Sequence, residues 1–97
     1  MAVQLNLGAA ERQLGRLDLA ETLLTEVLES VQRERGADHF DLVEPLEELA
    51  LVRAARGSKD EARAMLTRAL GLRRSNADSA FRIAATEDLL RAVERAP

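Results

Sequence analysis

Three glutamates, Glu44, Glu47 and Glu48, are the residues of this 97-residue chain whose types and spacing first suggest chemistry. On a helix, Glu44 and Glu48 lie one turn apart on the same face, and neighbouring carboxylates can act as a general acid and a general base. The simpler interpretation of that face is a solvated acidic patch. We therefore expect these carboxylates to contact a partner and not to catalyse a reaction.

The other residues that carry chemistry are sparse. His39 is the only histidine and there is no cysteine, which excludes a histidine-rich metal site, a disulfide framework and a thiol nucleophile. No phosphate-binding loop or nucleophile elbow is visible. We expect no enzyme activity, no cofactor and no metal, and we assign His39 a structural or solvent-exposed place in a linker.

The basic residues do not form a nucleic-acid site. Arg68, Arg73 and Arg74 cluster in sequence, but no aromatic residue that could stack on a base accompanies them. We expect these arginines to interact with the end of a helix and with solvent. No apolar run approaches the roughly 18 residues of a spanning helix and no signal peptide is visible, so we expect a cytoplasmic protein without membrane contact.

Charge is unevenly distributed along the chain. Residues 1–48 hold 11 acids and 4 bases (net -7), whereas residues 49–97 hold 6 acids and 10 bases (net +4), which gives the total of -3. This asymmetry fits either a chance distribution on solvated helix faces or a dipolar molecule whose halves attract one another, in stacking or in partner docking.

Apolar residues at helical spacing predict five helices that would position these side chains. The first covers residues 2–14, with Val3, Leu7, Ala10 and Leu14 as its core face. The second covers residues 18–36, and the third begins between residues 38 and 41 and ends at residue 56. The fourth runs from residue 58 to the polar linker at 73–76, and the fifth covers residues 78–95. Asp18 with Glu21 and Ser58 with Glu61 are predicted capping boxes, and Asp41 would cap the third helix so that Pro45 falls in its first turn.

The helices repeat. Gly15 recurs as Gly57, an offset of 42 residues (57 minus 15), and Ala20 recurs as Ala62 in the same register. The glycines permit a left-handed turn between helices, and the alanines predict two close helix crossings. A fixed period in this range indicates a stacked repeat protein, which usually binds and does not catalyse.

The repeated pattern resembles the tetratricopeptide repeat. Its first copy is Leu7-Gly8, Gly15, Ala20, Leu24 and Val27, and its second is Leu49-Ala50, Gly57, Ala62, Leu66 and Ala69. The linker at residues 36–41 is similar to that of the long, kinesin-light-chain type. The resemblance implies an all-α fold: a right-handed α-solenoid of two helix hairpins plus a C-terminal capping helix. One domain would span residues 1–97, with repeats at about 2–36 and 39–74 and the capping helix at about 78–95.

The same resemblance implies a function. In such stacks the first helix of each pair lines a concave groove that binds a protein or peptide. The groove candidates are Leu5, Asn6, Ala9, Arg12, Gln13, Glu44, Glu47, Glu48, Leu51, Ala54 and Ala55. Two alternatives stay open: a structural self-association domain, such as a homodimer that completes the short stack, and a regulatory segment of a larger bacterial signalling enzyme.

Overall fold

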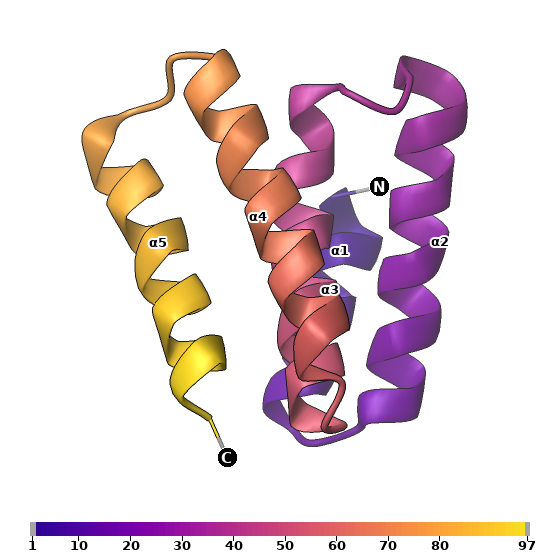
Figure 1. The fold of residues 1–97 in the computed structure, drawn as a ribbon. Helices are drawn as coiled ribbons and strands as arrows, with labels where there is room; N and C mark the ends of the chain where they lie inside the picture. Colours follow the sequence, from indigo (N-terminus) through magenta and orange to yellow (C-terminus); the bar gives the residue numbers. More distant parts are fainter. Residues whose placement is uncertain (1, 97) are drawn as a thin grey trace.

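A computed structural model describes residues 2–96, and all the regular structure within them is helical (Figure 1). The elements are α1 (Ala2–Gln13), α2 (Leu17–Arg35), the short 3-10 helix η1 (Phe40–Leu42), α3 (Val43–Ala55), α4 (Lys59–Ser75) and α5 (Ala80–Arg95). Antiparallel pairs α1–α2 and α3–α4 form two hairpins, and α5 packs against α4. The predicted all-α repeat fold is confirmed. No helix in this part of the chain is long and apolar enough to cross a membrane.

The turn inside each hairpin depends on its glycine. Gly15 and Gly57 have φ angles of 81° and 85°, in the left-handed region that favours glycine. In the second hairpin the amide that follows Gly57 donates to the carbonyl of Arg53 at 2.8 Å, which satisfies one of the free carbonyls at the end of α3. The turn before α5 repeats this geometry with Ala77, at φ 52°, in the glycine position.

The predicted capping boxes do not form. Helix α2 begins at Leu17, so Asp18 lies in its first turn, and Ser58 is the N-cap residue of α4 without a side-chain cap hydrogen bond. Arg53 gives the physical reason, because it binds both glutamates that would have reached back to the caps. Its Nε lies 2.9 Å from Glu21, and its Nη1 pairs with Glu61. Ion pairs between helices have replaced the local caps.

The start of α3 also differs from the prediction. Asp41 lies inside η1 and Leu42 precedes the helix, although Pro45 does fall in the first turn as expected. His39 is structural, because its Nδ1 accepts a hydrogen bond from the backbone N–H of Asp41 at 3.0 Å. Helix α4 continues through the expected linker to Ser75, so Arg73 and Arg74 are helical residues.

The predicted core face of α1 is wrong. Val3, Leu7 and Leu14 are 81%, 47% and 66% exposed, and Gly8 and Glu11 are the buried residues of this helix. Gly8 explains the rotation, because a Cβ atom at this position would lie 2.8 Å from the side chain of Leu24 in α2. The helix thus presents its smallest residue to its neighbour, which brings the two backbones close together.

The core lies between the hairpins and under α5. Ala20 and Ala62 are both fully buried, as expected for close crossings. Ala20 packs in a cluster with Leu24, Leu49 and Val52. Ala62 packs with Ala50, Leu66 and Val93, and Val93 belongs to α5. The fifth helix therefore covers the apolar side of the second hairpin.

Candidate partner-binding groove

Two of the predicted groove residues meet across the hairpins. The Nε of Arg12 in α1 donates to Glu48 in α3 at 2.7 Å, and both side chains are about one quarter exposed (23% and 26%). The sequence places these residues in different repeats, 36 positions apart. Their charges compensate each other, so Glu48 contributes little to an acidic patch.

Glu47 belongs to a network that joins three helices. Its carboxylate lies 2.9 Å from Nη2 of Arg73 in α4 and accepts a hydrogen bond from the hydroxyl of Thr86 in α5. Arg73 also donates to Thr86 at 2.9 Å and to Asp78 at 2.6 Å. Only 11% of the Arg73 side chain is exposed, so the expectation that it would face solvent is wrong.

Electrostatics favour the charged forms of Arg73 and Asp78. Burial lowers the pKa of the Arg73 guanidinium, but hydrogen bonds with Glu47 and Asp78 outweigh that effect and hold the pKa above its ordinary value. The hydrogen bond with Arg73 likewise lowers the pKa of Asp78 below its ordinary value of 3.8. Arg82 of α5 also lies 3.7 Å from Asp78, so two arginines compensate the two carboxylates beside the start of α5.

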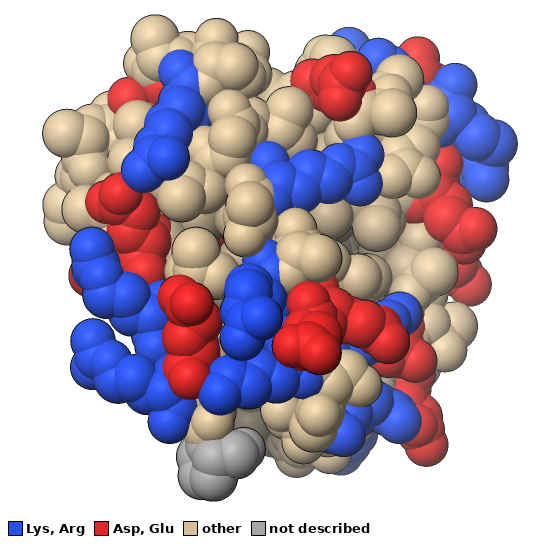
Figure 2. All heavy atoms as spheres, viewed as in Figure 1, with Lys and Arg blue, Asp and Glu red and all other residues tan. Residues whose placement is uncertain are grey.

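Other cross-helix pairs account for part of the charge asymmetry of the sequence. Arg53 and Arg56 of the basic half pair with Glu21 and Asp18 of the acidic half. The hydrogen bond with Asp18 raises the pKa of Arg56 above its ordinary value. On the face drawn in Figure 2, acidic and basic side chains lie next to one another over the lower part of the molecule. Attraction between the halves therefore acts within the chain, where the hairpins stack.

The remaining predicted residues differ in their exposure. Asn6, Gln13, Glu44 and Ala55 are exposed, and Leu5, Ala9, Leu51 and Ala54 are half-buried. Within residues 2–96, no side-chain hydrogen bond or ion pair engages Asn6, Gln13 or Glu44. The structure thus leaves two amides on α1 and one carboxylate on α3 unused, while it binds Arg12, Glu47 and Glu48 into the fold.

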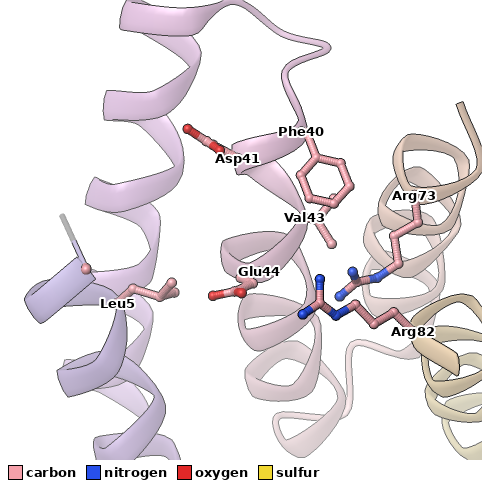
Figure 3. Close-up of a pocket in the computed structure, with 8 residues that line it drawn as sticks. Leu5, Phe40, Asp41, Val43, Glu44, Arg73 and Arg82 are labelled. Atoms are coloured by element: carbon pink, nitrogen blue, oxygen red, sulfur yellow. The ribbon is translucent and has the colours of Figure 1, made fainter. Parts of the chain in front are cut away.

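A cavity of about 390 Å³ lies between α1 and α5, next to Glu44 (Figure 3). Its lining residues are Ala2, Leu5, Phe40, Asp41, Val43, Glu44, Arg73 and Arg82. In Figure 3, Leu5 approaches from α1, Phe40 and Glu44 come from η1 and α3, and the two arginines extend from α4 and α5. A second, more open hollow continues past Phe40 and Arg82 along residues 76–79.

Sequence reasoning missed most of this cavity. Phe40, Val43 and Arg82 were not groove candidates, because the repeat pattern ends before Arg82 and treats Phe40 as a linker residue. One signal was present: Phe40 is one of only two aromatic residues in the chain, and an aromatic side chain in a polar linker is unusual. Nothing in the local sequence predicts that Arg82 approaches α3.

Comparison with known families supports the repeat interpretation. A family model of the tetratricopeptide repeat matches residues 1–75, which contain both hairpins and leave α5 outside the match. The comparisons with curated proteins and with solved structures gave no significant match. Repeats of this type generally mediate protein–protein interactions. The chain belongs to the tetratricopeptide repeat family.

Proposed function

We propose that this chain is a non-catalytic module that binds an extended peptide segment of a partner protein in the groove formed by α1, α3 and the start of α5. The observation that carries the proposal is the cavity of about 390 Å³, whose lining includes Glu44, a side chain that forms no hydrogen bond or ion pair within residues 2–96. Its size lies within the range of about 300–1,000 Å³ that is typical of ligand sites.

The chemistry of the groove suits a peptide backbone. Asn6 and Gln13 are exposed on the same helix, seven residues apart and therefore on similar faces. Each amide can donate and accept hydrogen bonds, as a peptide unit requires of its partner. Ala9 lies between these amides and is small enough to let a backbone approach. The groove thus offers backbone contacts along α1 and a side-chain cavity at its end.

Binding of fluorescently labelled peptides, measured by anisotropy, tests the proposal. The double variant Asn6→Ala, Gln13→Ala should weaken binding of any peptide that the wild-type chain binds by about fivefold or more, since each lost hydrogen bond contributes about 0.5–1.5 kcal/mol. Glu29→Gln is a suitable control, because Glu29 is exposed on α2. Equal weakening in the control, or none in the double variant, would contradict groove binding.

Self-association is a second candidate function, favoured by a specific observation. Val3 and Leu7 form an exposed apolar stripe on α1 that continues to Leu14 in the following turn, and Phe81 on α5 is 83% exposed. A two-fold dimer through the α1 stripe would cover Val3, Leu7 and Leu14. Sedimentation over a range of concentrations tests it: Leu7→Gln should shift a dimer toward monomer, whereas a wild-type chain that stays monomeric at high concentration would remove this candidate.

A further inference from the structure

We infer that the cavity beside Phe40 selects a peptide whose large apolar side chain is flanked by a basic residue on one side and an acidic residue on the other. This inference rests on the proposed function and specifies the ligand of the same groove. It follows from three features of the cavity: an acidic wall from η1 and α3, a basic side chain from α5, and an apolar floor.

Two exposed carboxylates make up the acidic wall. Glu44 is exposed and forms no ion pair within the described residues. Asp41 is exposed, and Nδ1 of His39 lies 3.6 Å from its carboxylate. The same Nδ1 accepts a hydrogen bond from the backbone N–H of Asp41 at 3.0 Å. A basic group of the ligand would therefore meet two acceptors on this wall.

The basic side of the cavity is Arg82. Its guanidinium lies 3.7 Å from Asp78, and 65% of the side chain is exposed, which makes this pair weak. Asp78 already accepts a bond from Arg73 at 2.6 Å and from the backbone N–H of Ser79 at 2.8 Å. Arg73 itself is bound by Glu47 and Asp78. Of the two arginines in the cavity, Arg82 is therefore the one that can bind a ligand carboxylate.

The floor between these walls is apolar. Val43 is buried, and Leu5 and Phe40 are half-buried and pack on the core cluster of Val43 and Leu46. A large apolar side chain that enters here removes its own surface and part of Phe40 from water, which is the main favourable contribution to binding. In an extended peptide, residues two positions before and after it point to the same side as it does, toward the cavity.

The two walls also exclude ligands. A peptide with acidic residues on both sides would place one of them against Glu44 and Asp41, and a peptide with basic residues on both sides would place one against Arg82. Like charges brought together at a binding surface weaken binding. These contacts therefore select against the two peptides with like charges, in addition to the favourable contacts that select the peptide with opposite charges.

Four synthetic peptides of one length test this inference by fluorescence anisotropy at low salt. Each has a central Phe, and the residues two positions away are Lys and Glu, Lys and Lys, Glu and Glu, or Gln and Gln. The Lys and Glu peptide should bind tightest, about 2–25-fold tighter than the Gln peptide, as expected for two exposed ion pairs. The advantage should shrink at high salt, because exposed charges are screened.

Charge reversal of each wall makes the test specific. Glu44→Lys leaves Asp41 in place, so it should abolish the preference for a lysine at the acidic wall, and Arg82→Glu should shift the preference to the peptide with two lysines. Glu29→Lys, which adds the same charge on α2, should leave the order unchanged. Circular dichroism spectra and thermal melts would establish that the variants are folded.

The results distinguish the inference from the proposed function. If all four peptides bind equally well and the Asn6, Gln13 double variant weakens them all, the groove binds peptides but the charge selection is wrong. If none of the four binds the wild-type chain, both the groove and its selectivity are overturned. A preference that follows the two charge reversals would support both.

Discussion

Replacing Gly8 by alanine should destabilise this fold, although alanine is the better helix former. Gly8 is buried in α1, and a Cβ atom there would lie 2.8 Å from Cγ and Cδ2 of Leu24. Leu24 is fully buried and packs with Ala20, Leu49 and Val52, so it has little room to move away. The substitution therefore sets a favourable helix propensity against an unfavourable contact.

The two effects can be compared. Glycine in the middle of a helix is less favourable than alanine by about 0.5–1 kcal/mol. Extra volume forced into a packed core costs about 1–3 kcal/mol. The difference is a net loss of about 1 kcal/mol, which corresponds to a fall in Tm of about 4–8 °C for a domain of this size.

Gly71 supplies a matched control in α4. It is exposed, and a Cβ atom there would meet nothing within 4 Å. Gly71→Ala should therefore raise the free energy of unfolding by about 0.5–1 kcal/mol. Urea unfolding followed by circular dichroism would measure both variants. If Gly8→Ala proves as stable as Gly71→Ala, the close approach of α1 and α2 is wrong.

A double variant checks the cause of the loss. Leu24→Ala alone should destabilise the chain by about 2–5 kcal/mol. In that background Gly8→Ala should become neutral or stabilising, because the added methyl group enters the vacated space. The two changes should thus be coupled by about 1 kcal/mol or more, as expected for residues in direct contact. Additive effects would show that Gly8 acts through something other than Leu24.

Further predictions concern the crossings, the network and the last helix. Ala20→Leu and Ala62→Leu should each lower stability by about 1–3 kcal/mol, since both sites are fully buried; wild-type-like melting in both would contradict the close crossings. Arg73 lowers the pKa of Asp78 in the folded state. The stabilisation of the fold by this pair is therefore present above pH 3.8 and is lost as the pH falls through the lower folded-state pKa. The free energy of unfolding of Asp78→Asn should accordingly fall less steeply with decreasing pH than that of the wild type below about pH 4. Identical pH profiles of the two proteins would show that the pair contributes nothing to stability. Removal of residues 76–97 should give an aggregating product, because Leu66 and Ala62 lose the cover of Val93; a cooperatively melting monomer of residues 1–75 would show that α5 is dispensable.

The repeat architecture could be predicted because its signals are local. The glycines fix the turns through a left-handed φ angle, and the alanines mark crossings through their small volume, so Gly15, Gly57, Ala20 and Ala62 each indicate their place without knowledge of the rest of the chain. Helical spacing also predicted the five α-helices. The assignment to the long type of repeat stays a prediction.

The outward face of α1 could not be predicted in the same way. Val3, Leu7 and Leu14 have the spacing of a core face, but spacing does not say where the neighbouring helices lie. Helix α1 packs mainly against α2 and contacts α3 through Arg12 and Leu5, and the rest of its surface faces solvent. The need to place Gly8 against Leu24 decided its rotation and left the apolar stripe exposed.

Which side chains border the candidate groove could be predicted from the sequence even less than the orientation of α1. Arg53 binds Glu21 across 32 residues and Arg73 binds Glu47 across 26, so no local pattern could show that these glutamates are engaged. The sequence by itself determined the helices, their turns and their order, because those follow from the backbone preferences and volumes of neighbouring residues. Only the tertiary structure decided which charges are compensated and which border the cavity, because electrostatic pairing depends on distances in space between residues far apart in the chain.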